Sequence, residues 1–281
     1  MDKVILTKIG VGLVGCGAIG SVIAEALDKG RVDNAILVIV YDIILERAKK
    51  LVSKLSYKSL IAGSLDEILR RSDVHLVVEA ASQDFVREYA VKILNSNKDL
   101  LIMSTGALLD ETLFSEIAKA TERTGKKIYV PSGAIVGIDN IKSAVLGKIE
   151  EAILITRKPP ISFRDTNLIE KNKIDISSIR EPLILYEGPA REAIKILPQN
   201  VNVAATLSLA GIGPDKTKVK VIADPAVKNI VHEIYVKGEF GEIYTKAVNK
   251  PFPKNPRTSY IAALSAIATL RRITSNIVIG T

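Results

Sequence analysis

Short apolar segments alternate with amphipathic segments through the first half of the chain. Apolar runs bounded by polar or turn residues predict buried strands at 9–14, 35–42, 59–62, 74–79, 100–103 and 127–130. Between these runs, apolar residues recur at helical spacing, as in the segment 19–27. Asp110 precedes one such segment as an N-cap, and Ser64 with Glu67 has the spacing of a capping box. The pattern predicts alternating strands and helices up to about residue 131.

This alternation is typical of a doubly wound α/β fold, in which helices cover both faces of a parallel sheet. Ligands of such sheets bind beyond the carboxyl ends of the strands. The strand at 74–79 is followed by Ala80 and Ala81, and the strand at 100–103 is followed by Ser104. These three residues are therefore candidate ligand-binding positions.

The pattern changes after Pro131. Two short helices are expected at 190–197 and 201–210, whereas 159–182 has little regular pattern and is expected to be an exposed excursion. Strands are predicted at 152–157, 216–223, 229–236 and 242–248, with hairpin turns at 224–225 and 238–241. We expect an α+β domain with a largely antiparallel sheet at 132–255, after a first domain at 1–131. A C-terminal helix within 256–281 is expected to pack back on the first domain.

The first predicted strand leads directly into a glycine-rich turn. In a G-x-G-x-x-G pattern the first glycine permits the tight turn, the second lets backbone approach a pyrophosphate, and the third lets the helix pack on the strand. The N-terminus of the following helix adds unpaired N–H groups and the positive end of a dipole. Between a strand and a helix, the pattern predicts a Rossmann dinucleotide-binding site at Gly15, Gly17, Ala18, Ile19 and Gly20.

Asp42 ends the second predicted strand, 22 residues after Gly20. A Rossmann fold places the acid that binds the adenosine ribose hydroxyls at about this spacing. Because an aspartate repels a 2′-phosphate, NAD is the expected cofactor, with NADP as the alternative.

Composition and charge exclude several other classes of protein. The 281 residues carry a formal net charge of +8, but the cations are scattered, without a basic run interleaved with aromatics, so no nucleic-acid partner is expected. No apolar run is long enough to span a bilayer, and no signal-peptide pattern is present, so we expect no membrane partner. One cysteine and two distant histidines predict neither a disulfide nor a metal site. A cytoplasmic protein is expected.

The two histidines differ in their candidate chemistry. His75 lies in a predicted central strand and is interpreted as a core or sheet-edge residue. His232 alternates in phase with Ile230 and Ile234, which by itself is typical of an imidazole at the edge of a core. Oxidation by NAD of an amine or alcohol needs a group that takes a proton near neutral pH. His232 is the candidate catalytic residue, although a lysine with a lowered pKa could do the same.

Three further segments carry alternatives. The small-residue loop 131–137, which contains Ala134, is either a domain crossover or a loop whose N–H groups close on a ligand. Asn202 and its neighbour Asn200 are either N-caps or amides that bind the nicotinamide carboxamide. Arg157 and Lys158 close a strand and are either solvated or hold a substrate carboxylate.

Seven segments together resemble L-aspartate dehydrogenases, whose nucleotide domain is related to that of homoserine dehydrogenase. They are GCGAIG, MSTGALLD, VPSGAIVGIDNI, TRKPP, PQNVNVAATLSLAGIG, DPAVKNIVHEIYVKGEFGE and NPRTSY. The resemblance covers nearly the whole chain and is weakest at about 161–184. It implies that His232 is the active-site histidine and that Ala134 and Asn202 contact the nucleotide.

The resemblance also implies a Rossmann domain followed by an α/β domain whose sheet supports a homodimer. The implied substrate is L-aspartate, which is oxidised with NAD(P) and water to iminoaspartate and oxaloacetate with release of ammonia, in support of NAD biosynthesis. Two alternatives stay open: a homoserine or other amino-acid dehydrogenase, and a non-catalytic NAD-binding regulator.

Overall fold

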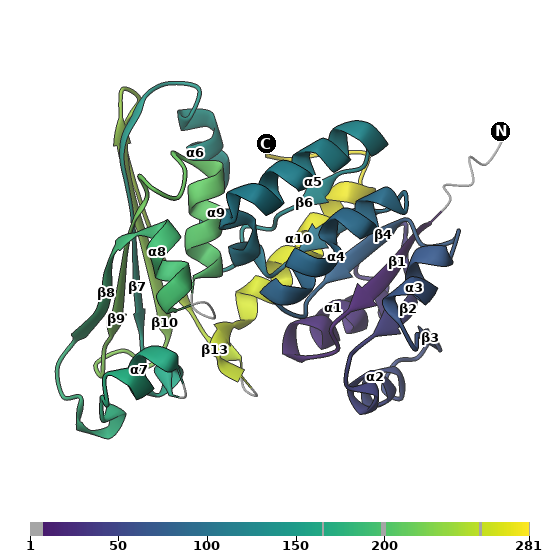
Figure 1. Ribbon diagram of the computed structural model, residues 1–281, viewed down its shortest axis with the longest axis horizontal. Helices are drawn as coiled ribbons and strands as arrows, with labels where there is room; N and C mark the ends of the chain where they lie inside the picture. Colours follow the sequence, from purple (N-terminus) through teal and green to yellow (C-terminus); the bar gives the residue numbers. More distant parts are fainter. Residues whose placement is uncertain (1–7, 165, 198–200, 253–254, 281) are drawn as a thin grey trace. The chain divides into compact units, whose positions relative to one another are not determined.

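The computed structural model describes residues 8–164, 166–197, 201–252 and 255–280. The chain divides into two compact units, each with its own large sheet (Figure 1). The first unit contains Met1–Pro131 and Ala263–Ile279, so that most of the last helix belongs to it. The second unit contains Ser132–Ala262 and Gly280–Thr281.

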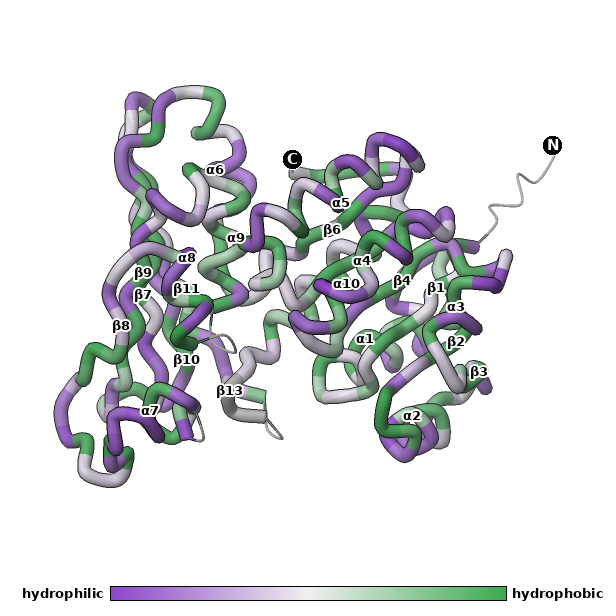
Figure 2. The backbone as a smooth tube through the Cα atoms, viewed as in Figure 1, coloured by the Kyte–Doolittle hydropathy of each residue, from purple (hydrophilic) through white to green (hydrophobic). Residues whose placement is uncertain are grey.

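The first unit is built on a six-stranded parallel sheet with the order β3-β2-β1-β4-β5-β6. Its strands are apolar and largely buried, as the green of β1 and β4 in Figure 2 illustrates. The predicted parallel sheet is therefore confirmed. The strands are β1 (Ile9–Val14), β2 (Ala35–Tyr41), β3 (Leu60–Ile61), β4 (Leu76–Glu79), β5 (Asp99–Ile102) and β6 (Ile128–Tyr129).

Helices connect these strands, and their caps follow local sequence only in part. Asp110 caps α5 by accepting the N–H of Leu113 at 3.0 Å, as predicted. Ser64 is the N-cap of α3, but its side chain accepts no capping bond, and Glu67 accepts the N–H of Gly63 instead, so the predicted capping box is wrong. The elements are α1 (Ala18–Asp28), α2 (Leu45–Val52), α3 (Leu65–Arg70), α4 (Gln83–Asn95), η1 (Thr105–Leu109), α5 (Glu111–Thr124) and α10 (Tyr260–Thr274).

The second unit is built on a five-stranded sheet with the order β11-β10-β7-β9-β8. Only β7 and β9 are parallel, and the other pairs are antiparallel. The hairpin at 238–241 is confirmed, but the hairpin at 224–225 is wrong, because β7 lies between β9 and β10. The strands are β7 (Ile149–Lys158), β8 (Leu183–Pro189), β9 (Lys218–Ala223), β10 (Ile230–Gly238) and β11 (Gly241–Asn249), with a separate ribbon of β12 (Pro251–Phe252) and β13 (Asn255–Ser259).

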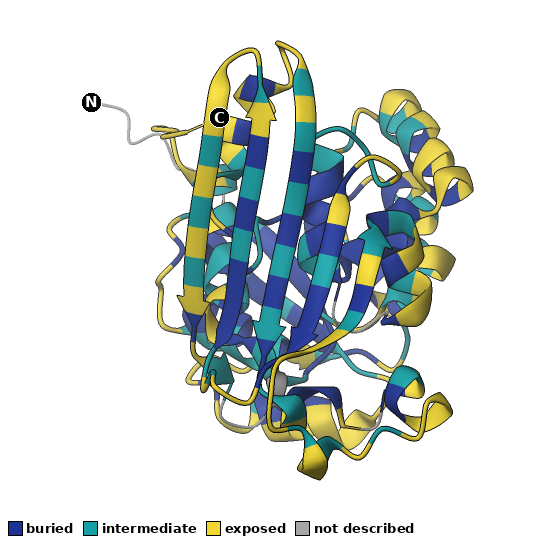
Figure 3. Cartoon of the chain, turned by 90° about the vertical axis from the view of Figure 1, so that its left-hand side faces the viewer, coloured by how far each residue is buried: buried dark blue, intermediate teal, exposed yellow. Residues whose placement is uncertain are grey.

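Burial alternates along the central strands of this sheet, as the bands in Figure 3 show. On β7 the buried series is Ala152, Leu154, Thr156 and Lys158. Three helices accompany the sheet: α6 (Ile138–Ala144), α8 (Ala190–Ile196) and α9 (Asn202–Ala210). Of these, α8 packs on β8 and β9, and α9 packs on α6 and α8. One face of the sheet is thus the core of the unit.

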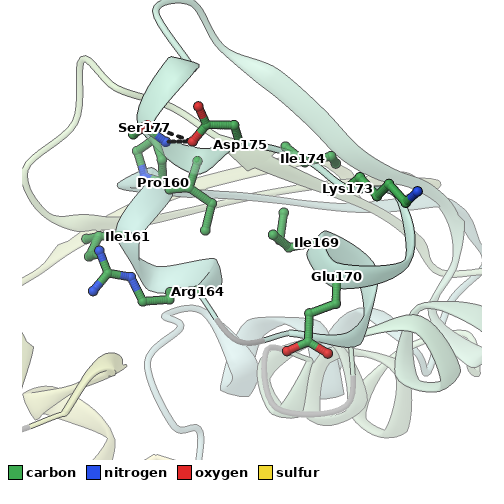
Figure 4. A pocket seen from close by; sticks show the side chains of 10 residues that line it. Pro160, Ile161, Arg164, Ile169, Glu170, Lys173, Ile174, Asp175 and Ser177 are labelled. Carbon is green, nitrogen blue, oxygen red and sulfur yellow. Dashed lines mark hydrogen bonds between the residues drawn. The ribbon is translucent and has the colours of Figure 1, made fainter.

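The expected excursion at 159–182 is more ordered than its sequence pattern predicts. It contains η2 (Pro160–Phe163), α7 (Asn167–Lys171) and η3 (Ile176–Ser178), and Phe163 is fully buried. Isoleucines and charged side chains line a surface hollow of about 610 Å³ there, beside which Asp175 accepts the N–H of Ser177 (Figure 4). The prediction of an irregular exposed segment is therefore wrong in part, because Phe163 and Ile169 anchor it.

Among the residues that the structure describes, no helix combines the length and the apolar character that a membrane crossing requires.

Candidate active site

The geometry of the turn after β1 explains why two of its positions, Gly15 and Gly20, are glycine. Gly15 has a φ of +91°, and a Cβ there would collide with the backbone of Ala80. A Cβ on Gly20 would collide with the carbonyl group of Gly15. At Gly17, the N-cap of α1, no neighbouring heavy atom lies within 4 Å of the Cβ position. The backbone at the start of α1 is therefore open to an anionic ligand.

Asp42 follows β2, and its carboxylate lies against the glycine turn. Its Oδ2 accepts the N–H of Cys16 at 2.8 Å, and its Oδ1 accepts the N–H of Ile44 at 2.8 Å. Burial, helped by the Asp42 charge, raises the pKa of the Cys16 thiol to about 12, so Cys16 is a protonated filler of the turn. Each Asp42 oxygen keeps acceptor capacity for a further donor such as a sugar hydroxyl.

The fully buried Glu79 ends β4, and no sequence pattern predicts its role. Its Oε1 accepts the N–H of Ala81 at 2.8 Å and the hydroxyl of Ser104 at 2.7 Å. Its Oε2 accepts the N–H groups of Met103 at 3.0 Å and Ser104 at 2.9 Å. Burial raises the pKa of Glu79, and the bonds from Ser104, Ala81 and Met103 oppose that rise. One carboxylate thus ties the carboxyl ends of β4 and β5 together.

These contacts bring the nucleotide candidates of the first unit to one edge of the parallel sheet. The open backbone at Gly17, the acid at the end of β2 and the small residues after β4 are the features that a dinucleotide needs. The residues of this edge therefore fit a dinucleotide. The candidates gathered there are Gly15, Gly17, Ala18, Ile19, Gly20, Asp42, Ala80, Ala81 and Ser104.

His75 does not belong to this edge. It precedes β4 rather than lying within it, its side chain is exposed, and β4 is an inner strand of the sheet. The interpretation of His75 as a core or sheet-edge residue is therefore wrong. Its Nδ1 accepts the N–H of Gly10 at 2.9 Å, which joins the amino ends of β1 and β4. Its role is therefore structural, at the end of the strands where ligands of such sheets do not bind.

His232 lies on the buried face of the five-stranded sheet. It is directly opposite Thr156 on β7, and its Nδ1 lies 2.9 Å from the Thr156 hydroxyl oxygen. Lys158 is two residues beyond Thr156 in the same buried series. His232 and Lys158 are each 4% exposed. An imidazole, a hydroxyl and an ammonium group therefore share one face of the sheet.

Burial controls the protonation of this cluster. It lowers the pKa of His232 to about 3, and the positive charge of Lys158 adds to that shift. Burial likewise lowers the pKa of Lys158 to about 8. Near neutral pH the imidazole is therefore uncharged, while the lysine is mostly charged.

Arg157, between Thr156 and Lys158 on β7, lies on the opposite face. Its Nη1 is 3.3 Å from Oδ2 of Asp224, and its Nε is 3.7 Å from Oε2 of Glu233. The sequence does not distinguish Arg157 from Lys158 as a candidate for binding a substrate carboxylate, but the structure places them on opposite faces of the sheet. Arg157 pairs with acids of its own unit, and Lys158 lies on the face of His232.

The loop containing Ala134 is fixed to the same sheet. The amide of Asn249 donates to the Ala134 carbonyl group at 2.9 Å, and Asn249 lies opposite Ile230 on β10. Ile230 is two residues before His232 in the same buried series. The loop thus ends close to the strand that carries the imidazole.

Asn202 begins α9 near this loop. A Cβ on Gly133 would lie 3.7 Å from Cγ1 of Val203, so the loop adjoins the first turn of α9. The N-cap of α9 is Val201, which excludes the reading of Asn202 as an N-cap. Asn200, the other amide candidate, lies outside the described residues.

Each of the two units matches a known protein family. A family model for "Homoserine dehydrogenase, NAD binding domain" matches residues 15–131, and one for "Aspartate dehydrogenase, C-terminal" matches residues 139–273. The L-aspartate dehydrogenase of Methanosarcina barkeri is 45% identical over 271 residues, which cover 96% of this chain and 99% of that protein. The chain belongs to the L-aspartate dehydrogenase family.

Other relatives of the L-aspartate dehydrogenase family extend the match. The L-aspartate dehydrogenase of Methanocella arvoryzae is 45% identical over the same 96% of the chain and 99% of its own length. The crystal structure of aspartate dehydrogenase from Thermotoga maritima has a TM-score of 0.73 and 27% identity, and the match covers 97% of this chain and 99% of that one. Membership of the family makes the parallel-sheet unit a pyridine-nucleotide-binding domain.

Proposed function

We propose that this chain is an L-aspartate dehydrogenase that oxidises L-aspartate to iminoaspartate and then to oxaloacetate and ammonia. The observation that carries the proposal is the uncharged His232, held by Thr156 beside Lys158, in a chain 45% identical to an enzyme of that name. In this proposal residues 1–131 bind the nucleotide and residues 132–255 carry the substrate chemistry, with the C-terminal helix completing the first domain.

In the proposed reaction, bound NAD would supply the acceptor for the hydride that leaves the α-carbon of aspartate. The amino group loses its extra proton, so the product of this step is iminoaspartate. His232 then removes a proton from the water that adds to the imine carbon, and it returns a proton to the departing nitrogen. The balance is aspartate, NAD and water giving oxaloacetate, ammonium and NADH with release of one proton.

We propose NAD rather than NADP as the preferred cofactor. The Asp42 carboxylate beside the glycine turn would repel a 2′-phosphate, and the next residues, Ile43 and Ile44, carry no charge that could pair with one. We further propose that Ala134 and Asn202 contact the nucleotide, because the loop and the first turn of α9 adjoin.

We also propose a homodimer formed through the sheet of the second unit. Tyr244 on β11 is 64% exposed, Val248 is 57% exposed, and Ile184 on β8 is 49% exposed. Apolar side chains on a sheet face are typical of a surface that another chain covers. Light scattering of the purified chain should give twice the monomer mass, and Val248→Lys should return it to the monomer mass without loss of fold.

Formation of NADH from NAD with L-aspartate, homoserine or L-glutamate in separate reactions tests the activity. We expect turnover with aspartate alone. Turnover with homoserine or glutamate would identify a different amino-acid dehydrogenase. NADH binding without turnover of any amino acid would identify a non-catalytic regulator.

His232→Ala tests the assigned base. Removal of a general acid–base group lowers the rate by about a hundred- to ten-thousandfold, and NAD binding should stay nearly unchanged. The matched control is His75→Ala, which removes the other histidine from the far end of the parallel sheet and should keep its turnover number. Full activity of His232→Ala would remove this residue from the mechanism.

A further inference from the structure

Glu79 is fully buried at the carboxyl end of β4, the strand that lies beside β1 in the parallel sheet. Four donors meet its two oxygens: the N–H groups of Ala81, Met103 and Ser104, and the Ser104 hydroxyl. An ionised carboxylate offers about four acceptor sites, so this set of donors fits the charged form and leaves little acceptor capacity. Any role of Glu79 in ligand binding must therefore act through the groups that it holds.

The burial of a carboxylate is costly, which makes Glu79 informative. Transfer of an ionised group from water into the protein interior is strongly unfavourable, and burial accordingly raises the pKa of Glu79. The donated bonds oppose that rise and offset part of the cost. An apolar side chain would fill the end of a buried strand without this penalty. Charged groups that are retained against such a cost are concentrated at functional sites.

The peptide between Ala80 and Ala81 lies directly against the glycine turn. A Cβ built on Gly15 would collide with the carbonyl oxygen of Ala80 and would lie 2.8 Å from the nitrogen of Ala81. That nitrogen is the donor to Oε1 of Glu79, at 2.8 Å. Gly15 and Glu79 thus contact the same peptide, so a movement of this peptide would displace the turn or open a gap beside it.

The close packing continues from Gly15 into α1. A Cβ on Gly20 would collide with the carbonyl oxygen of Gly15 and would lie 3.7 Å from Cβ of Ala80. Gly17 lies between these two glycines as the N-cap of α1, and its backbone is open to a ligand. The N–H groups at this helix end are the ones that meet a pyrophosphate in a Rossmann fold. Glu79 is therefore connected to the anion-binding end of α1 through close backbone contacts.

A second carboxylate holds the same turn from β2. Oδ2 of Asp42 accepts the N–H of Cys16 at 2.8 Å. Asp42 is half-buried, so it can also meet a ligand, whereas Glu79 is enclosed. The two acids thus differ in function: Asp42 can contact the nucleotide, and Glu79 can act only through the backbone.

We propose that Glu79 is a positioning residue of the nucleotide site, because its carboxylate holds the 80–81 peptide against Gly15 and so keeps the glycine turn in the shape that receives a pyrophosphate. The inference goes beyond the proposed function, since it concerns nucleotide binding by the first unit and not the oxidation of aspartate. It predicts that removal of the carboxylate weakens ligands that carry a pyrophosphate more than ligands that lack one.

The first measurement needs no variant. Ala81 is exposed, and its N–H donates to Glu79. Hydrogen exchange of the free full-length chain, followed by NMR, should show this N–H exchanging about tenfold or more slowly than an unstructured amide. Addition of ADP-ribose should change that rate little, because the peptide is already held. Exchange of Ala81 at the unstructured rate would overturn the inference, even if a variant of Glu79 does not fold.

Glu79→Gln tests the role in binding. Titration calorimetry measures the affinity for ADP-ribose, which carries the pyrophosphate, and displacement of fluorescent NADH measures the affinity for adenosine, which lacks it. We expect the ADP-ribose affinity to fall by about ten- to a hundredfold, the loss typical of a charge-assisted bond, and the adenosine affinity to fall by less than about threefold. The N–H of Ala81 should exchange faster in the variant.

Lys98→Met is the matched control for lost stability. Lys98 lies at the amino end of β5 in the same sheet and is 4% exposed, and its Nζ donates to the carbonyl groups of Arg71 and Val74. This variant should be destabilised but should keep its ADP-ribose affinity within about threefold, because its site is distant from the turn. Full ADP-ribose affinity in Glu79→Gln would remove Glu79 from the nucleotide site. Equal losses in the two variants, or equal losses of ADP-ribose and adenosine in Glu79→Gln, would leave Glu79 with a role in stability alone.

Discussion

Two of the buried charged groups, one in each unit, lie in different surroundings. Glu79, in the first unit, is surrounded by four donors that come from Ala81, Met103 and Ser104. Lys158, in the second unit, has a pKa lowered to about 8 by burial and in turn disfavours a proton on His232. Burial disfavours the charged form of both groups, and at Glu79 the four donated bonds offset part of that cost.

This difference suits two kinds of ligand. A nucleotide site built from open backbone at Gly17 and a frame fixed by Glu79 needs little rearrangement when the ligand binds. A site for an acidic substrate gains affinity when the substrate itself relieves an unfavourable charge. The first region should therefore lose stability when its charge is removed, and the second should gain it.

Glu79→Gln should have the largest effect. The amide can accept with its one oxygen, but its NH₂ group would meet N–H or O–H donors, which leaves about two buried donors without partners and costs roughly 2–6 kcal/mol. Urea denaturation measures the loss, and nucleotide affinity should fall with it. Glu67→Gln is the matched control, because Glu67 accepts the exposed N–H of Gly63 and its replacement should change stability little.

Lys158→Met should act in the opposite direction. The pKa of Lys158 is lowered from 10.5 to about 8. Below pH 8 the burial of the charged amine therefore lowers the free energy of unfolding of the unchanged chain by roughly 3 kcal/mol, and Lys158→Met removes this penalty. Between pH 8 and 10.5 the unfolded chain binds the proton and the folded chain does not. The unchanged chain therefore gains stability as the pH rises, and the advantage of the variant should shrink.

Urea denaturation at pH 7 and pH 9.5 measures that advantage, and Lys98→Met is the matched control. Lys98 is also 4% exposed, and its Nζ donates to the carbonyl groups of Arg71 at 2.6 Å and Val74 at 2.7 Å. Its replacement leaves those carbonyl groups unpaired and should destabilise the chain. Destabilisation by both lysine variants would remove the contrast between the two regions.

Features fixed by neighbouring residues could be predicted from the sequence, and features assembled from distant segments could not. The glycine turn and Asp42 follow from local geometry, because a positive φ at Gly15 and a close approach at Gly20 permit few other residues. Glu79 could not be predicted, since its partners Met103 and Ser104 lie on another strand end.

The same reasoning explains why predictions for the second unit were wrong. The turn at 224–225 resembles a hairpin turn locally. However, β7 pairs in parallel with β9 and lies between β9 and β10, the two strands that this turn connects. Lys158 ends β7 and is buried, whereas a strand end considered alone indicates exposure to solvent. In both cases a non-local contact overrides the local pattern.

Asp42→Asn tests the nucleotide region with a smaller expected effect. Removing the negative charge beside the ribose position should narrow the preference for NAD over NADP by about ten- to a hundredfold, as repulsion of a 2′-phosphate is lost. The ratio of kcat/KM values for the two cofactors measures this. Asp84→Asn, which removes an exposed charge from the first turn of α4, should leave the ratio unchanged.

Thr156→Val should have the smallest effect and tests the second region at its most local contact. The variant keeps the shape of the side chain but removes the hydroxyl that lies 2.9 Å from Nδ1 of His232, so the ring loses its orienting partner. The net value of such a bond is about 0.5–1.5 kcal/mol, which predicts a fall in kcat of about two- to tenfold with little change in the KM for NAD. Thr156→Ser restores a hydroxyl and should recover most of the rate. A Thr156→Ser chain as slow as Thr156→Val would mean that packing of the methyl group, and not the hydroxyl, holds the imidazole.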